Sequence, residues 1–171
     1  MTDVRQAPKL ALQKATEKDI PLIHDLAHKI WPQAYSKLLS IDKINYMLEL
    51  FYSEASLQKQ IKEHHTFLIV YDETVPTGFA SYSEIEKGVF KLHKIYILPT
   101  QQGKGTGRFL IENVIKNILP HGAQTLQLNV NRQNRAKDFY EKLGFIVIKE
   151  VDVDIGHGHF MNDYVMEKKI N

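Results

Sequence analysis

One segment, from Ile95 to Arg108, constrains the fold of this chain more than any other. It begins as an apolar stretch typical of a buried strand, passes Pro99 and a turn rich in glycine, and continues as an amphipathic helix. Glycines lack the Cβ atom that would block a ligand, and they tolerate positive φ angles. The unpaired N–H groups at the start of the following helix point outward together, which suits them to bind phosphate.

Two well-known phosphate-binding motifs do not fit this turn. Counted from Gly103 and Gly105, the dinucleotide-binding fingerprint requires a third glycine where Arg108 stands. The P-loop requires Ser or Thr directly after its lysine, but Gly105 follows Lys104. A third pattern, Q-x-x-G-x-G, does fit.

That third pattern begins at Gln102 and places its glycines at Gly105 and Gly107. A second motif follows downstream, where residues 134–145 match N-x-A-x-x-F-Y-x-x-x-G-F after an apolar strand. Together the two motifs resemble the GNAT superfamily of acetyl-CoA-dependent N-acetyltransferases, in the layout of bacterial enzymes that act on small amines or polyamines. The resemblance spans nearly the whole chain, from Leu10 to Met166.

The periodicity of apolar residues predicts a single domain, residues 1–171, that alternates between helices and strands. We expect strands at 10–12, 66–71, 78–86, 90–98, 126–130, 145–153 and 160–166, and helices at 16–30, 41–52, 54–61, 110–118 and 136–143. Trp31-Pro32 is expected to end the first helix. This order predicts an α/β (α+β) fold with helices on both faces of a mixed sheet. The resemblance implies about seven mostly antiparallel strands, of which the fourth and fifth are parallel and splayed.

Composition excludes several classes of protein. Lys and Arg number 22 against 20 Asp and Glu, and this small excess provides no field that would attract nucleic acid over the whole surface. The chain has no cysteine, so disulfides, thiolate metal sites and a cysteine nucleophile are impossible. Residues 1–6 lack the apolar region of a secretory signal, and no apolar run is long enough for a membrane span. We therefore expect a cytoplasmic protein that binds neither nucleic acid nor membrane.

The resemblance implies a site for acetyl-CoA as co-substrate. The glycine turn would bind its pyrophosphate, mainly through backbone N–H groups. Ile97 and Leu98 would pair by their backbone with the pantetheine arm in the gap between the splayed strands, and Asn134 would contact that arm. Arg135 and Lys142 would approach the adenosine 3′-phosphate. The expected cofactor-binding residues are Ile97, Leu98, Gln102, Gly103, Lys104, Gly105, Thr106, Gly107, Arg108, Asn134 and Lys142.

Transfer of an acetyl group to an amine requires an oxyanion donor, a proton donor and a base. A backbone N–H near Ile97 or Leu98 would stabilise the oxyanion. Tyr140 matches a family position near the thioester sulfur, where it would donate to the departing thiolate. Relatives keep a glutamate where this chain has His93, whose imidazole could serve as base near neutral pH. Glu84 on the adjacent strand or a water relay is the alternative base.

The acceptor is less constrained than the cofactor. The segment between the first two helices roofs the acceptor cleft in this fold, so Trp31 and Tyr35 are expected to line a wall that binds the acceptor amine. His157 and His159 share one face of a turn, but a third metal ligand is not evident, so no metal site is expected. An exposed edge strand in the closing hairpin would allow a homodimer.

The function expected from these features is direct transfer of an acetyl group from acetyl-CoA to a small amine, a polyamine or a peptide amine in a ternary complex. Two alternatives remain open at this point. One is an acyl-CoA-binding sensor without catalysis on the same fold, and the other is a regulatory module that binds ATP at the glycine turn.

Overall fold

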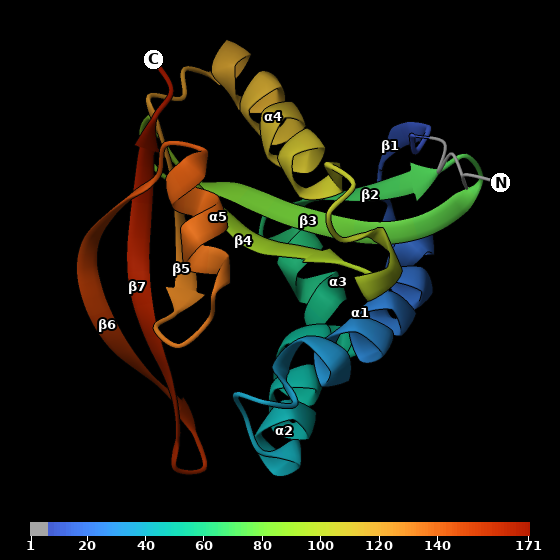
Figure 1. The fold of residues 1–171 in the computed structure, drawn as a ribbon, viewed down its shortest axis with the longest axis vertical. Coiled ribbons are helices and arrows are strands. Elements are labelled where there is room, and N and C mark those ends of the chain that lie inside the picture. Colours follow the sequence, from blue (N-terminus) through green and yellow to red (C-terminus); the bar gives the residue numbers. More distant parts are fainter. Residues whose placement is uncertain (1–6) are drawn as a thin grey trace, which may run out of the picture.

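A seven-stranded sheet organises residues 7–171, which are the residues that the computed structural model describes (Figure 1). The strands lie in the order β1-β2-β3-β4-β5-β7-β6. The strands are β1 (Leu10–Lys14), β2 (Thr66–Asp72), β3 (Val75–Glu86), β4 (Val89–Ile97), β5 (Thr125–Asn131), β6 (Ile146–Gly156) and β7 (His159–Lys169). The helices are α1 (Ile20–Tyr35), α2 (Ile41–Tyr52), α3 (Glu54–Lys62), α4 (Thr106–Ile118) and α5 (Ala136–Lys142), with short 3-10 turns at Glu17–Asp19, Pro99–Gln101 and Leu119–His121.

Every neighbouring pair of strands in this sheet is antiparallel except β4 and β5. These two run parallel and are joined by α4, as a strand–helix–strand crossover requires. They pair only from Val89 opposite Thr125 to Leu92 opposite Leu128, and beyond that point they diverge. The predicted fold class, including the splayed parallel pair, is confirmed.

Two hydrophobic cores lie on opposite faces of the sheet. On one face α4 and α5 pack against the central strands, with Leu110 of α4 and Leu126 of β5 completely buried. On the other face α1, α2 and α3 cover β2 and β3, and Ile23 and Phe79 are completely buried there (Figure 1). Burial of apolar side chains on both faces fixes the sheet between two layers of helices.

The first helix differs from its prediction at its C-terminal end. Its start is as expected, since Thr16 and Asp19 form a capping box. Pro32 does not end the helix, which continues to Tyr35. A proline removes one backbone hydrogen bond, but Trp31 and Tyr35 both pack against Tyr96 of β4. Tertiary packing therefore carries the helix one turn beyond the proline.

Strand β4 contains a bulge next to the point at which it separates from β5. Ser81 of β3 lies opposite Lys94, and Tyr82 lies opposite Leu92, so His93 has no counterpart on β3. One extra residue interrupts the alternation of side chains. His93 and Lys94 consequently both face the layer of α1, α2 and α3, where His93 stacks on His65 and Lys94 lies over Tyr52.

Two predictions from the sequence concern the formation of a homodimer and the presence of membrane-spanning segments. β6 is an edge strand with exposed apolar side chains, among them Ile146 and Ile148, so the homodimer stays a prediction. Among the described residues, none of the helices has the length and hydrophobicity that crossing a membrane would require. Residues 1–6, in which a secretory signal was not expected, lie outside the described part of the chain.

Candidate active site

The divergence of β4 and β5 opens a cavity of about 970 Å³. Its walls come from both layers of helices: α1 and α2 on one side, α4 and α5 on the other, with β4, β5 and β7 between them. The glycine turn and a group of aromatic side chains both line this cavity. One continuous space thus joins the segment predicted to bind phosphate to the segment predicted to bind an amine.

The glycine turn has the geometry of an anion-binding site. Gly103 and Gly105 have φ angles of +77° and +83°, and a Cβ at either position would meet nothing within 4 Å. Gly105 caps α4 without any side-chain hydrogen bond to the first helical N–H groups. The hydroxyl Oγ1 of Thr106 is buried and has no partner among residues 7–171. Unpaired donors around open space fit a phosphate group.

Most of the residues predicted for the site line this one cavity. Those that do are Trp31, Tyr35, His93, Ile97, Gln102, Gly103, Gly105, Thr106, Gly107, Arg108, Asn134 and Tyr140. Four others do not line it: Glu84, Leu98, Lys104 and Lys142. The predicted roles of the first group, of Lys104 and of Lys142 stay predictions. The contacts of Glu84 and Leu98 argue against the roles predicted for these two residues.

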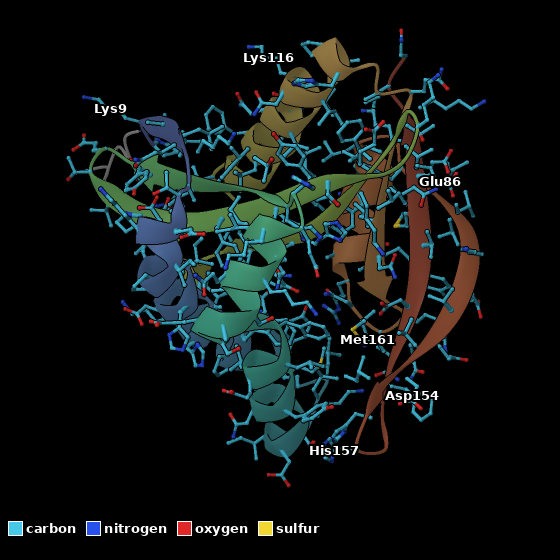
Figure 2. All side chains as sticks on the ribbon, turned by 180° about the vertical axis from the view of Figure 1, so that it is seen from behind. Lys9, Glu86, Lys116, Asp154, His157 and Met161 are labelled. Carbon is cyan, nitrogen blue, oxygen red and sulfur yellow. The ribbon has the colours of Figure 1, made fainter. Side chains whose placement is uncertain are left out.

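Glu84 is too far along β3 to act as a base. Its carboxylate Oε1 accepts a hydrogen bond of 2.9 Å from the backbone N–H of Gly88, within the turn between β3 and β4. Figure 2 shows Glu86, beside the same turn, well away from Met161, a residue that lines the cavity. The carboxylate therefore stabilises a turn rather than facing the cavity.

The backbone of Leu98 is also engaged elsewhere. Its N–H donates to the carbonyl of Thr77 at 2.8 Å, which leaves this group unable to bind the pantetheine arm or an oxyanion. Successive residues of a strand direct their N–H groups to opposite sides. The N–H of Ile97 therefore points away from β3, toward the side on which β5 has diverged. Of the two predicted oxyanion donors, only Ile97 keeps that orientation.

Tyr140 of α5 reaches the cavity with its phenol. The residue is buried, and its hydroxyl has no hydrogen-bond partner among the described residues. Burial raises the pKa of this phenol, and the nearby Tyr35 raises it further. The hydroxyl therefore keeps its proton at neutral pH and is available as a hydrogen-bond donor toward the cavity.

His93 is held in an environment that disfavours protonation. Its Nε2 is 2.7 Å from the hydroxyl Oγ of Ser83, and its ring stacks on His65 with centroids 4.2 Å apart. Burial lowers its pKa to about 3, and His65, Lys94 and Lys91 contribute to the shift. An imidazole with so low a pKa gains little by taking a proton near pH 7. These surroundings argue against the predicted role as base.

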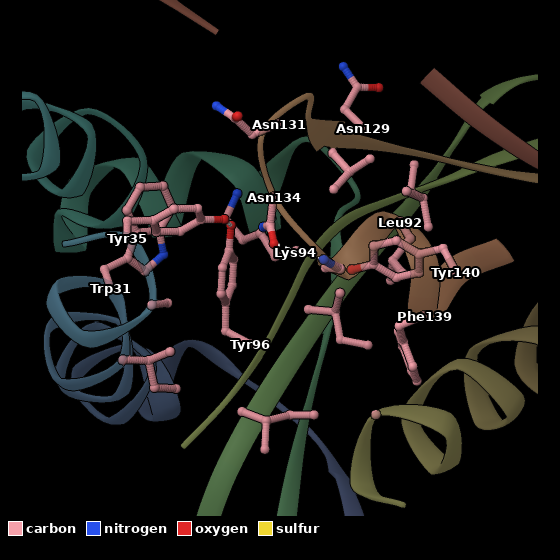
Figure 3. Close-up of a pocket in the computed structure, with 18 of the residues that line it drawn as sticks. Trp31, Tyr35, Leu92, Lys94, Tyr96, Asn129, Asn131, Asn134, Phe139 and Tyr140 are labelled. Atoms are coloured by element: carbon pink, nitrogen blue, oxygen red, sulfur yellow. Dashed lines mark hydrogen bonds between the residues drawn. The ribbon is translucent and has the colours of Figure 1, made fainter. Parts of the chain in front are cut away.

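Aromatic side chains form one wall of the cavity (Figure 3). Trp31 and Tyr35 project from α1, with ring centroids 4.6 Å apart. The hydroxyl groups of Tyr35 and Tyr96 are 3.0 Å apart. Tyr52 of α2 packs edge-on against the ring of Trp31. The two predicted acceptor-binding residues thus lie on this wall, together with Tyr96 and Tyr52.

The sequence analysis missed two buried charged residues of the cavity, Lys94 and Asp163. Lys94 is 8% exposed, and burial with the neighbouring Lys91 lowers its pKa to about 8. Asp163 of β7 is 7% exposed; burial raises its pKa, against the opposing effect of Asn129, which donates at 3.5 Å. The bulge at His93 hides the orientation of Lys94 from any pattern of alternation. For Asp163 a signal was visible, because Met161 and Val165, which share its face of the strand, are apolar.

The hairpin of β6 and β7 touches α2 across the open side of the cavity. Nζ of Lys43 donates to the carbonyl of Phe160 at 2.5 Å, and the hydroxyl of Tyr46 donates to the carbonyl of Ile155. His157, at the tip of the hairpin, packs edge-on against Tyr46 (Figure 2). These contacts explain the place of the histidine pair: it packs on an aromatic ring, and the described residues contain no cluster of potential metal ligands.

Comparison with known proteins identifies the family to which these features belong. The profile described as "Acetyltransferase (GNAT) domain" matches residues 35–165. A curated relative, the [ribosomal protein bS18]-alanine N-acetyltransferase of Haemophilus influenzae, is 45% identical over 62 residues, which cover 36% of this chain and 40% of the relative. An uncharacterized N-acetyltransferase of Bacillus subtilis, YuaI, is 28% identical over 137 residues, or 77% of this chain and 78% of its own.

Solved structures share the whole fold. The PaiA N-acetyltransferase of Thermoplasma acidophilum, crystallised in complex with coenzyme A, superimposes with a TM-score of 0.79 and 24% identity. The superposition covers 94% of this chain and 99% of that one.

Proposed function

Because the chain belongs to the GNAT acetyltransferase family, we propose that it is an N-acetyltransferase that uses acetyl-CoA and transfers the acetyl group directly to an amine. One observation supports this function above the others. A single cavity is lined by the glycine turn at the start of α4, by the aromatic wall on α1 and by Tyr140. Both substrates can therefore occupy one space at the same time, as direct transfer requires.

The residues of the turn fit the diphosphate of acetyl-CoA. The open space above Gly103 and Gly105 admits phosphate oxygens, and the hydroxyl of Thr106 is a donor without a partner among the residues that the structure describes. Arg108 lines the same end of the cavity, although Glu112 shares its charge through an ion pair of 2.8 Å. Acetyl-CoA bound there would supply the activated acetyl group and a thiol as leaving group. Asn134, at the end of the cavity near α5, would contact the arm.

Two groups of the protein serve the transfer itself. The backbone N–H of Ile97 points toward the gap between β4 and β5, where it stabilises the negative charge that develops on the thioester oxygen. Tyr140 keeps its proton because its pKa is raised, so its hydroxyl donates to the sulfur as the thiolate departs. Both groups are fixed in position before the reaction, and neither must reorganise during it.

The amine must lose a proton, and Asp163 is better placed than His93 to accept it. Its carboxylate lines the cavity from β7, and its pKa is raised from the ordinary value, so it binds a proton more readily than a solvent-exposed aspartate does. The hydrogen bond from Asn129 and the charges of Lys91 and Lys43 oppose the effect of burial on the pKa of this carboxylate. His93 is then a structural partner of Ser83 and His65.

The activity is tested by following release of free thiol from acetyl-CoA in the presence of amine acceptors. The panel contains small amines, amino acids, polyamines and a peptide with N-terminal alanine, the residue named in the Haemophilus relative. Turnover with any of these amines supports the proposal. Saturable binding of acetyl-CoA without turnover would indicate a sensor on the same fold, and tighter binding of ATP than of acetyl-CoA would refute the assignment of the glycine turn.

A further inference from the structure

Lys94 is a buried cation without a counter-charge. The residue is 8% exposed, and no carboxylate and no hydrogen-bond acceptor engages its ammonium group among residues 7–171. Its Nζ lies over the ring of Tyr52, 5.2 Å from the centroid, and 5.9 Å from that of Phe51. Lysines are almost never buried in proteins unless they are paired. The lack of a partner within this described part of the chain points to a partner that arrives with a ligand.

The position of Lys94 assigns that ligand to the acceptor half of the cavity. The bulge at His93 directs Lys94 to the face covered by α2, whereas the glycine turn leads into α4 on the opposite face. In the close-up of the cavity, Lys94 lies between the aromatic side chains of α1 and Tyr140 (Figure 3). A group bound by Lys94 would therefore belong to the molecule that receives the acetyl group and not to the phosphates of acetyl-CoA.

The remaining charges of the acceptor half do not neutralise Lys94. The carboxylate of Asp163 is influenced by Lys91, Arg132 and Lys43, but it does not act on Lys94. Lys91 instead adds repulsion to Lys94 and helps to lower its pKa to about 8. At neutral pH most Lys94 side chains are still charged, so the cavity presents an unsatisfied positive charge beside a wall of aromatic rings.

On the premise of the proposed acetyltransferase activity, we propose that Lys94 is a specificity-determining residue that binds a carboxylate of the acceptor, so that the acceptor is an amino carboxylic acid. The acceptor amine then lies toward Asp163, which attracts its ammonium form, and the carboxylate pairs with Lys94. The aromatic wall of Trp31 and Tyr52 receives the apolar part of the molecule. A polyamine would place a second cation next to Lys94, where it would be repelled.

The experiment compares acceptors that differ only in the carboxylate. Each of several amino acids, with small, aliphatic or aromatic side chains and with α- or ω-amino groups, is assayed beside its carboxamide and its decarboxylated amine, and spermidine is included. Release of thiol from acetyl-CoA gives kcat/KM. For the wild-type protein we expect the carboxylate form of the best acceptor to exceed its two neutral counterparts by about 10- to 100-fold.

Three variants identify the residue responsible. Lys94→Met keeps the length of the side chain and removes its charge, so the preference for the carboxylate is lost while the carboxamide is still acetylated. Lys94→Arg retains the charge and keeps part of the preference. Lys91→Met removes a lysine of the same strand and the same cavity, and it keeps the preference for the carboxylate.

Each contrary outcome has a distinct meaning. Equal use of carboxylate and carboxamide, or a preference for spermidine, overturns the role of Lys94 but leaves the acetyltransferase activity in place. Failure of every amine to release thiol overturns the activity and this inference together. Acetylation of Lys94 itself, detected by mass spectrometry after incubation with acetyl-CoA alone, overturns the inference, because the lysine would then be an acceptor.

Discussion

Leu92 of β4 and Leu128 of β5 are the last residues at which the two parallel strands lie in register. Beyond this pair β4 remains attached to β3 alone, and β5 remains attached to β7. The backbone of Ile97 is therefore open on the side that faces β5. All the chemistry proposed for this protein depends on that opening, because it admits the thioester between β4 and β5. Each of these strands is held in place by its pairing with β3 or β7.

Replacement of Tyr140 by phenylalanine removes a hydroxyl that has no hydrogen-bond partner among residues 7–171. We expect kcat to fall by about 10²- to 10⁴-fold, because the departing thiolate loses its proton donor. The affinity for acetyl-CoA, measured by isothermal titration calorimetry, should stay within a factor of about three, since the ring still packs beside Phe145. Unchanged turnover would remove Tyr140 from the chemistry.

Gly105→Val places a side chain into the empty space at the start of α4 and should abolish binding of acetyl-CoA. Gly122→Val is the matched control, because Gly122 has a φ angle of +81°, faces open space and lies away from the cavity. Both substitutions strain the backbone, by about 1–2 kcal/mol each. Only Gly105→Val is expected to prevent binding in calorimetry. Equal affinities of the two folded variants would contradict the assignment of the turn.

The stability of the protein should decrease in acid because of His93. The pKa of this imidazole is about 3 in the folded protein and about 6.5 in the unfolded chain, so the unfolded chain binds a proton first as the pH falls. The stabilisation is complete above about pH 6.5 and is lost toward pH 3. Compared with His93→Gln, the wild-type protein should lose about 1–2 kcal/mol of unfolding free energy by about pH 5, measured with urea.

The same variant tests the catalytic role of the imidazole. Since His93 is neutral from about pH 6 to about pH 8, the profile of kcat/KM over this range should have the same shape for His93→Gln as for the wild-type protein. Loss of an ionisation from that profile in the variant would restore His93 as the base.

Lys94→Met should stabilise the protein at neutral pH while it impairs recognition of the acceptor. The pKa of Lys94 is lowered to about 8, so below that pH the folded state carries the whole cost of a buried charge. The cost decreases as the pH rises from about 8 toward the ordinary lysine value, and stability increases accordingly. The variant should gain up to ~3 kcal/mol at about pH 7, and less at about pH 10. A less stable variant at neutral pH would show that Lys94 is paired in the folded protein.

Asp163→Asn separates catalysis from stability. The raised pKa of Asp163 means that folding disfavours its charge, so the neutral variant should be at least as stable as the wild-type protein at neutral pH. Its kcat should fall by about 10²-fold or more, and the decline of kcat/KM toward acid should disappear, because no carboxylate remains to be protonated. Thermal unfolding measures the stability of the variant, and the pH dependence of kcat/KM for the same preparation measures the effect on catalysis. A variant with normal kcat would return the choice of base to His93 or water.

Much of the fold could be predicted because each element depends on local residues. The bounds of α2 agree with the apolar spacing of Ile44, Met47 and Leu48, and the closing hairpin turns at the predicted glycines around His157. Pro32 was misjudged, since the packing of Trp31 on Tyr96 brings together residues far apart in the sequence. Propensity alone does not contain such contacts.

The candidate site was predictable where a motif encodes backbone geometry and not where a single side chain carries the function. The glycine turn predicted its own conformation, with the positive φ of Gly105 as the signature. Glu84 lies on β3, a strand that contributes no residue to the lining of the cavity, and its place at the turn became evident only from the pairing of β3 with β4. Lys94 was missed because a bulge of one residue decides which face of β4 it occupies.

The bulge in β4 also limits how this strand can change in length. Deletion of His93 would leave Leu92 opposite Tyr82 and Lys94 opposite Ser81, so every other pair with β3 would survive. Loss of a residue elsewhere in the strand would turn the side chains beyond it to the wrong face of the sheet. Within β4, insertions and deletions in related chains should therefore be tolerated at this position, beside the mouth of the gap, and selected against at its neighbours.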